Sequence, residues 1–385
     1  MGLLIFGLFS FVLLVVAHEY GHFLVAKKKG VEVEEFGVGF PPKIFGRKMG
    51  KGIFEGYYTV NLLPLGGFVR LKGEHDADKE KGAFGSVSTS AKLQIMLAGV
   101  LVNYLLAVVL FTIVAWVGMP QLAPNQFSVK SNETISRSDV VSNFVDEGSP
   151  AASAGIVSGD IIKSINNQSI STSQELIDAA KSNAGQEVTI SFIHKGDTRQ
   201  SETTLLSSQE VEASKQTDNP KGYLGVVPTE YKLATYTWAA PVVAVGSTVQ
   251  FSWLTLKAIG SSLAALGKAF VNAVTGDGTA AKQEASKASE NVSGPVGIFA
   301  ILQQGTALGY QFILFVIALI SLTLAIMNFL PIPALDGGRA FVMLLFRAMK
   351  KPLTAKREEL IHGTGFALLI LLFVVITIVD VRRFY

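Results

Sequence analysis

The sequence predicts a polytopic α-helical membrane protein with about four transmembrane helices and an inserted mixed α/β extracytoplasmic domain. Three observations carry this prediction. Of the 385 residues, 49% are hydrophobic and only 16% are charged, and soluble domains carry more charge. Several apolar runs approach or exceed the length of about 20 residues that crosses a bilayer as a helix. Between them lies a polar stretch long enough to fold as a domain of its own.

Four segments are predicted to cross the membrane, because each is strongly apolar and almost free of charge. They are residues 1–26, 93–118, 312–335 and 364–379. The first lacks the basic start and the cleavage site of a signal peptide, so we expect it to remain as a helix. A fifth run, 238–256, is diluted by Pro, Gly, Ser, Thr and Gln. We expect it to form an amphipathic or surface-lying helix rather than a span.

Basic residues predict which side of the membrane each loop faces. The loop at 27–92 carries twelve Lys and Arg residues, and the loop at 336–363 carries six. Cytoplasmic loops are enriched in these residues, so both loops are expected in the cytoplasm. Residues 127–206 and 207–311 then lie on the other side. The second of these ranges is expected to hold amphipathic helices and a flexible polar loop at 275–292.

Residues 127–206 are expected to form the inserted domain. Apolar strand segments flank a Gly-Asp turn, residues 173–183 have helical spacing, and residues 187–196 alternate like a strand. The stretch from Gly148 to Asn166 resembles a PDZ domain. A PDZ domain binds a peptide by adding it as a strand to a sheet edge. The resemblance therefore implies a peptide ligand or a size filter, and a plain spacer domain is the alternative.

The first predicted span carries a polar motif, because residues 18–22 read His-Glu-Tyr-Gly-His. Residues i and i+4 share one face of a helix, so His18 and His22 can bind one Zn²⁺ with Glu19 beside them as general base. Two histidines that form hydrogen bonds within a helix bundle are the alternative. A charged group at the centre of a span costs about 2.5–3.5 kcal/mol to insert, which favours a functional site.

A catalytic zinc site usually has three protein ligands. His194 is expected on the other side of the membrane, His75 in a charged loop and His362 at the end of a basic loop. Asp336 fits better, because it follows the third predicted span at about the depth of His22 in the first. A turn residue in Asp-Gly-Gly is the alternative for Asp336. The absence of cysteine excludes thiolate ligands, disulfides and a cysteine nucleophile.

These residues together resemble a known pair of signatures. The motif at 18–22 and the segment from Asn328 to Asp336, with its two prolines, are similar to those of the site-2 proteases. On this likeness the chain is identified as a member of this family of zinc intramembrane metalloproteases, in the bacterial branch of the regulator of sigma-E protease type, with one PDZ domain. One departure is Val100, where the family often has proline at the start of the second span.

The resemblance implies hydrolysis of peptide bonds within transmembrane segments, for example of anti-sigma factors or remnant signal peptides. His18, His22 and Asp336 would bind Zn²⁺, Glu19 would activate the zinc-bound water, and Asn328 would lie near the substrate. The protein would be a multi-pass protein of the cell inner (plasma) membrane, with its active site near the cytoplasmic side. Its partners would be transmembrane protein substrates and the lipid bilayer, and no basic aromatic-rich run suggests nucleic acid.

Residues 61–74 are similar to the family's cytoplasmic, membrane-associated β-hairpin. Alternating residues at 57–73 would offer a strand edge to an unwound substrate, and Gly66 and Gly67 would permit close approach of its backbone. An ordinary hairpin with a Gly-Gly bend is the alternative.

Two other classes of function remain as alternatives. A non-catalytic membrane-anchored PDZ scaffold or chaperone would have little reason to retain Glu19 beside two potential ligands. A zinc transporter would need acidic or histidine residues at several depths of the membrane, and the sequence shows one such cluster.

Overall fold

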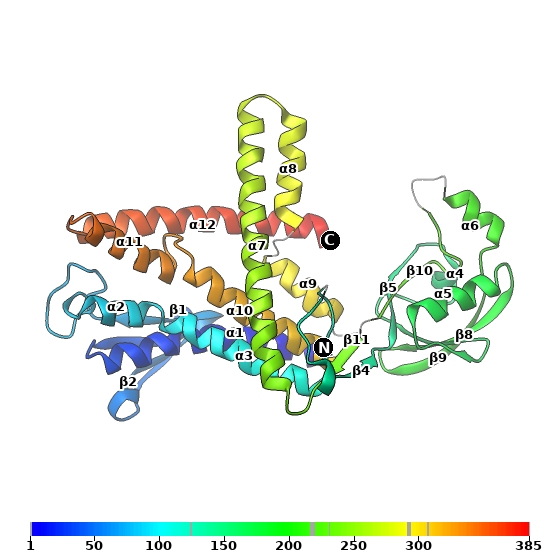
Figure 1. Ribbon diagram of the computed structural model, residues 1–385, viewed down its shortest axis with the longest axis horizontal. Coiled ribbons are helices and arrows are strands. Elements are labelled where there is room, and N and C mark those ends of the chain that lie inside the picture. The colour runs from blue at the N-terminus through cyan, green and yellow to red at the C-terminus, as the bar shows by residue number, and fades with distance from the viewer. Residues whose placement is uncertain are drawn as a thin grey trace. The chain divides into compact units, whose positions relative to one another are not determined.

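The computed structural model describes residues 2–123, 125–215, 220–230, 232–290, 294–305 and 308–384. The chain divides into two compact units (Figure 1). The first unit comprises residues up to 112, residues 241–301 and residues from 314 onward, and it contains the long helices and a β-hairpin. The second unit comprises residues 113–240 and 302–313 and contains two further sheets.

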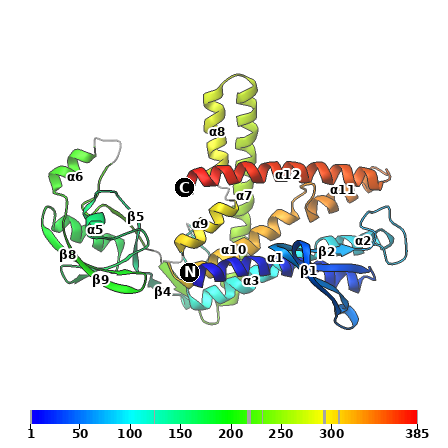
Figure 2. The same cartoon turned by 180° about the vertical axis from the view of Figure 1, so that it is seen from behind.

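Five helices of the described chain are long and apolar enough to cross a membrane. They are α1 (Gly2–Lys28), α3 (Ala98–Val117), α7 (Ala240–Val274), α10 (Tyr310–Phe329) and α12 (Ala355–Phe384). Four of them correspond to the predicted spans, and α7 contains most of the doubtful run 238–256. By length and composition α7 qualifies as a span, yet it runs across α12 rather than alongside it (Figures 1 and 2). Its position on the membrane surface stays a prediction.

Shorter helices connect these long ones. They are α2 (Thr89–Met96), α8 (Gly278–Glu290), α9 (Pro295–Gly305) and α11 (Asp336–Ala348). The expectation of a flexible loop at 275–292 was wrong for Gly278–Glu290, which form α8. Residues 291 and 292 are outside the described residues. Alanine favours helix, and the Asp277 carboxylate accepts a hydrogen bond from the backbone N–H of Ala280 at the start of α8.

Helix α1 ends where the sequence changes from apolar to basic. Gly30 adopts a left-handed φ of 81°, and its backbone N–H donates to the carbonyl of Lys27. The N–H of Val31 donates to the carbonyl of Ala26, and both side chains belong to one buried apolar cluster. This is a Schellman termination. It fixes the direction in which the chain leaves α1 toward the hairpin.

The hairpin consists of β1 (Val33–Met49) and β2 (Gly56–Leu71), paired antiparallel. Aromatic side chains hold it against α1. The ring of Phe23 lies 5.8 Å from that of Phe36 and 5.6 Å from that of Tyr58. Tyr20 stacks on Phe23 at 5.4 Å. Because Tyr20 is part of the motif at 18–22 and Phe23 follows it, β2 is held directly beside that motif.

A small apolar core joins the ends of α1, α2 and α11. Its buried members are Ala26, Val31, Phe84, Ile95, Met96, Ala340, Val342, Met343 and Leu353. Beside it, the Nζ atom of the fully buried Lys92 lies 2.5 Å from an oxygen of Asp76. The same oxygen lies 3.0 Å from the guanidinium of Arg347 on α11. These contacts fix α11, and with it Asp336, relative to α1.

Helix α10 ends at Phe329, six residues before the expected boundary at 335, because two prolines in 330–335 cannot continue a helix. The chain turns back at once. A Cβ at Gly337 would collide with the carbonyl oxygen of Phe329, so the close approach requires glycine. The turn places Asp336 at the first position of α11.

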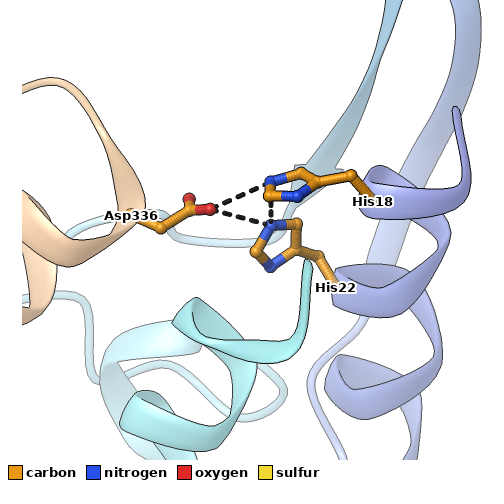
Figure 3. A group of neighbouring side chains, drawn as sticks. All are labelled: His18, His22 and Asp336. Atoms are coloured by element: carbon orange, nitrogen blue, oxygen red, sulfur yellow. Dashed lines mark hydrogen bonds and ion pairs between the residues drawn. The ribbon is translucent and has the colours of Figure 1, made fainter. Parts of the chain in front are cut away.

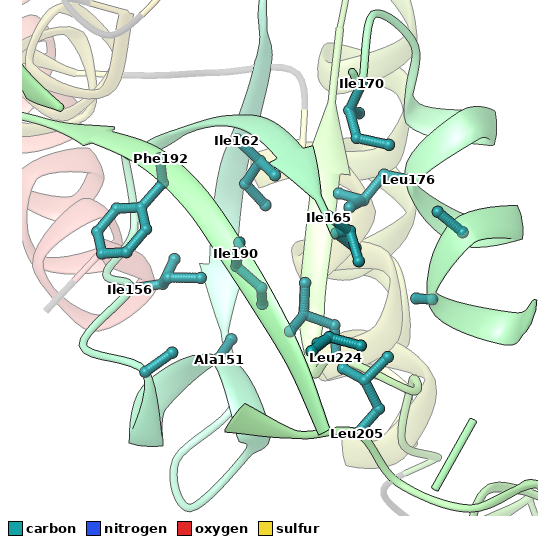
Figure 4. Packing of buried hydrophobic residues seen from close by; sticks show 14 of the residues in the cluster. Ala151, Ile156, Ile162, Ile165, Ile170, Leu176, Ile190, Phe192, Leu205 and Leu224 are labelled. Carbon is teal, nitrogen blue, oxygen red and sulfur yellow. The ribbon is translucent and has the colours of Figure 1, made fainter. Parts of the chain in front are cut away.

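The second unit carries a six-stranded sheet with the order β10-β5-β6-β8-β9, and β7 pairs with β6. Its strands are β5 (Val140–Val145), β6 (Ile161–Ile165), β7 (Gln168–Ser169), β8 (Glu187–His194), β9 (Asp197–Thr204) and β10 (Val226–Thr229). The helices of this region are α4 (Pro150–Ser153), α5 (Ser173–Ser182) and α6 (Ser208–Ser214). Side chains of the sheet, such as Ile162 and Ile190, form one buried core with Leu176 of α5 (Figure 4).

The expected domain boundaries at 127–206 were wrong at both ends. Strand β10 lies beyond residue 206 and pairs with β5, so the sheet extends to residue 229. A separate three-stranded sheet has the order β3-β11-β4. Its strands are β3 (Met119–Pro120), β4 (Thr134–Arg137) and β11 (Lys232–Thr235). Residues 134–137 therefore pair outside the domain core, because their hydrogen-bond partners come from the chain that leaves the domain.

Candidate metal centre

Three side chains that are distant in sequence meet at one point (Figure 3). His18 and His22 point from α1 toward Asp336 at the start of α11. The Nε2 atom of His18 lies 3.0 Å from Oδ2 of Asp336, and Nε2 of His22 lies 3.2 Å from the same oxygen. The two Nε2 atoms are 3.2 Å apart. In the part of the chain that the structure describes, no other group of three His, Asp or Glu donors converges in this way.

The triangle of donors has the size that a tetrahedral zinc ion requires. Zinc binds nitrogen and oxygen ligands at about 2.0–2.1 Å, so two tetrahedral donors lie about 3.3 Å apart. The three separations here are 3.0, 3.2 and 3.2 Å. Catalytic zinc sites keep a fourth position open for water or substrate. The residues present therefore fit a catalytic zinc ion with three protein ligands.

The remaining three of the five histidines have other partners. His75 pairs with acidic side chains, His194 with Asp160, and His362 with the backbone N–H of Ala334. None of them lies within the donor triangle. Asp336 is thus the side chain that meets the two histidines, as the depth argument from the sequence predicted. Its role as a metal ligand stays a prediction.

Glu19 lies beside the donor triangle, at the wall of a cavity of about 210 Å³. The same cavity is lined by His18, Asp336 and Asn328 of α10. The backbone of Val69 in β2 lies near the Glu19 carboxylate. Glu19 therefore lies between the hairpin and a space next to the metal position, and Asn328 lines the same space.

Gly66 and Gly67 of β2 lie against α1. A Cβ on Gly67 would stand 3.5 Å from Cγ of Glu19 and 3.0 Å from the carbonyl oxygen of Gly37. A Cβ on Gly66 would stand 3.6 Å from the side chain of Val15, which lines the cavity. The strand backbone therefore runs close to Glu19. Contact of these two glycines with a substrate stays a prediction.

Two further residues face the donor triangle, and the sequence assigned no catalytic role to either. A Cβ on Gly99 of α3 would stand 2.5 Å from Nε2 of His22 and 2.6 Å from Nε2 of His18. One turn later, the Asn103 amide nitrogen lies 3.4 Å from Nδ1 of His18. Gly99 and Asn103 are four residues apart and so share one face of α3. The sequence alone does not show that this face packs against the histidines of α1.

Comparison with known proteins decides the family. Residues 6–372 match peptidase family M50. The chain belongs to peptidase family M50. It is 31% identical to a "Putative zinc metalloprotease" of Clostridium acetobutylicum, over 98% of this chain and 97% of that protein. It is 28% identical to zinc metalloprotease RasP of Shouchella clausii, over 97% of both chains. It is also 28% identical to the regulator of sigma-W protease RasP of Bacillus subtilis, over 97% of this chain and 96% of the relative.

The expected family is therefore confirmed. This M50 peptidase is an intramembrane zinc metalloprotease of the site-2 type, and Zn²⁺ is its cofactor. It is a multi-pass membrane protein that acts on membrane proteins in a lipid environment, and the scaffold or chaperone alternative is not favoured. A solved structure, the PDZ domain of an SdrC-like protein from Listeria monocytogenes, matches 24% of this chain and 88% of its own at 25% identity, with a TM-score of 0.20.

Proposed function

We propose that this M50 peptidase cleaves transmembrane segments at a zinc site formed by His18, His22 and Asp336, with Glu19 as general base. One observation carries the assignment: three donors of the right type stand 3.0–3.2 Å apart beside a carboxylate, and both histidines lie in a mostly apolar helix. Bound zinc supplies Lewis acidity, which lowers the pKa of a water molecule toward about 7 and polarises the scissile carbonyl.

Glu19 is placed to move the proton. Its carboxylate shares the cavity with the metal-binding residues, so one of its oxygens can accept a proton from the attacking water. The same oxygen can return that proton to the leaving amide nitrogen. Strand β2 packs against Glu19 from the hairpin side and restricts the positions that its side chain can take. The apolar side chains of Val15, Leu324 and Leu335 also line the cavity.

The substrate has to expose its backbone before cleavage. A transmembrane helix satisfies its own peptide groups by internal hydrogen bonds, so the segment to be cut must unwind. Strand addition along β2, where Gly66 and Gly67 approach the cavity, would hold the unwound segment by main-chain hydrogen bonds. The Asn328 amide is suited to bond a peptide group that enters the cavity.

Charge supports an orientation for this reaction. The basic loop after α1 and the basic residues of α11 favour a cytoplasmic location for this end of the bundle. The active site would then lie near the cytoplasmic face of the inner membrane, with the PDZ-like domain on the other side as a peptide-binding module or a size filter. The name of the Bacillus subtilis relative refers to regulation of sigma-W. That name supports membrane-bound anti-sigma factors as a substrate class, with remnant signal peptides as the second candidate.

The test uses the purified full-length protein in lipid nanodiscs with a single-span test peptide. Glu19→Gln should retain one zinc ion per chain and lose cleavage by about 10²–10⁴-fold, which is the usual contribution of a general base. The exposed Glu34→Gln serves as the matched control and should cleave at the parental rate. Removal of metal by a chelator should stop cleavage, and added zinc should restore it. A Glu19→Gln variant that cleaves as fast as the parent contradicts the proposal.

A further inference from the structure

Asn103 is a buried amide whose bonding is incomplete. It lies on α3 with 1% of its surface exposed and lines the cavity beside His18 and Glu19. Its amide nitrogen lies 3.4 Å from Nδ1 of His18, whereas its Oδ1 atom is buried without a hydrogen-bond partner among the described residues. A buried carbonyl oxygen left without a donor destabilises the folded protein, so this arrangement calls for an explanation.

The chemistry of a zinc-bound histidine supplies that explanation. His18 directs Nε2 toward Asp336 and His22. A neutral imidazole that offers Nε2 to a metal carries its proton on Nδ1, and this N–H needs an acceptor. The oxygen and nitrogen of an asparagine amide exchange places when the amide turns by 180° about its last bond. In the turned orientation, Oδ1 of Asn103 faces Nδ1 of His18 and accepts its proton.

We propose that Asn103 is a positioning residue that accepts the Nδ1–H hydrogen bond of His18 and so fixes the tautomer that presents Nε2 to zinc. This inference rests on the ligand assignment proposed above. The neighbouring histidine is held in the same way. Nδ1 of His22 lies 2.7 Å from the backbone carbonyl oxygen of Ile95, and a carbonyl can only accept, so Nε2 of His22 is free to bind metal.

Both anchors come from one stretch of chain. Ile95 at the end of α2 and Asn103 in α3 are separated by eight residues, and Gly99 lies midway between them. Gly99 and Asn103 are four residues apart and share one face of α3. The end of α2, through the Ile95 carbonyl, and this face of α3 therefore orient the two histidines, while Gly99 leaves the space beside their Nε2 atoms open.

A role limited to helix packing makes a different prediction. The link between α3 and α10 uses the backbone of Asn103, whose carbonyl accepts a hydrogen bond from the Ser321 hydroxyl at 2.8 Å. That bond survives any change of the Asn103 side chain. The amide side chain is thus available for a hydrogen bond with His18. Its removal should lower the affinity for zinc and leave the contact between α3 and α10 in place.

The experiment compares Asn103→Asp with Asn103→Leu in the full-length protein, by zinc competition with a chromophoric chelator. Leu removes the acceptor at similar volume and should weaken zinc binding about 10–100-fold. Asp retains an acceptor and loses the amide donor, so its zinc affinity should match or exceed the parental value. Thr112→Val on the same helix, whose hydroxyl bonds within α3, is the control and should not change zinc affinity.

Three outcomes would overturn the inference. Parental zinc affinity in Asn103→Leu would show that the acceptor is not needed, and an equal loss in Asn103→Asp would show that the donor or the packing matters instead. Should the Leu variant fail to fold, nitrogen-15 NMR of histidine-labelled, zinc-loaded parent protein decides. A protonated Nδ1 on His18 is expected, and a protonated Nε2 overturns the inference. His18→Ala separates the role of Asn103 from the proposed zinc ligands. A His18→Ala variant that still binds zinc with parental affinity contradicts the assignment of His18 as a ligand.

Discussion

The substitution Gly99→Ala tests the geometry of the metal centre with a single methyl group. The added Cβ would stand 2.5 Å from Nε2 of His22 and 2.6 Å from Nε2 of His18, whereas non-bonded heavy atoms pack at about 3.5 Å. Each imidazole would have to retreat by about 1 Å. Metal–ligand distances tolerate only about 0.2 Å. We therefore expect zinc affinity to fall at least 100-fold, which is about 2.7 kcal/mol.

The assay is zinc per chain after equilibration with a chelator, followed by cleavage of the single-span peptide. Alanine has the higher helix propensity, by about 1 kcal/mol, so any loss of zinc in Gly99→Ala cannot be attributed to an intrinsically weaker helix. Gly363→Ala on α12 is the matched control, because no atom lies within 4 Å of the Cβ it would add. The control should bind one zinc ion with parental affinity. Equal zinc affinity in Gly99→Ala and the parent would refute the placement of the metal between the two Nε2 atoms.

Further predictions concern the third ligand and the ion pairs that join its helix, α11, to α2. Asp336→Ala should abolish stoichiometric zinc, whereas Glu359→Ala, which removes an exposed carboxylate, should not. Lys92→Met removes the buried cation 2.5 Å from Asp76 and should lower the free energy of unfolding by about 3 kcal/mol, measured by thermal or denaturant unfolding. Burial raises the pKa of Asp76, but the hydrogen bond and charge of Lys92 and the charge of Arg347 outweigh it and hold that pKa below 3.8. The stabilisation that the ionised Asp76 provides is therefore complete above pH 4 and should be lost as the pH falls through the lowered pKa. Thermal scans between pH 6 and about 2 should show that the parent loses more stability than Lys92→Met.

The zinc motif could be predicted from the sequence because its signal is local. His18 and His22 are one helical turn apart, and the apolar run around them makes any other explanation costly. Asp336 could be predicted as the third donor because the depth of a residue in the membrane can be estimated from the basic residues that flank each span. The two prolines before Asp336 cannot continue a helix, so α10 ends at Phe329 rather than at the expected residue 335.

The remaining parts of the site depend on contacts between distant segments. Gly99 is an ordinary small residue in an apolar helix until α1 is placed opposite it, and Asn103 reads as an interhelical polar residue. The close approach of β2 to Glu19 depends on the aromatic contacts that hold the hairpin against α1. Such pairings leave no periodic pattern along the chain.

Errors in the fold prediction have similar causes. Helix α8 was expected as a loop because its residues are small and polar, although Asp277 and the alanines after it form a recognisable helix start. Strand β10 was missed because it joins its sheet from more than twenty residues beyond β9. The length of α7 was underestimated, because polar residues interrupt its apolar pattern without interrupting the helix.

X-ray absorption at the zinc edge of the purified, catalytically active protein tests the central claim most directly. The structure predicts one zinc ion per chain with two imidazole nitrogens and oxygen ligands at about 2.0–2.2 Å. His18→Ala should lose one imidazole contribution together with most of the metal, and His194→Ala, outside the donor triangle, should leave the spectrum unchanged. A parental spectrum without two imidazoles, or full zinc occupancy in His18→Ala, would contradict the account of the site.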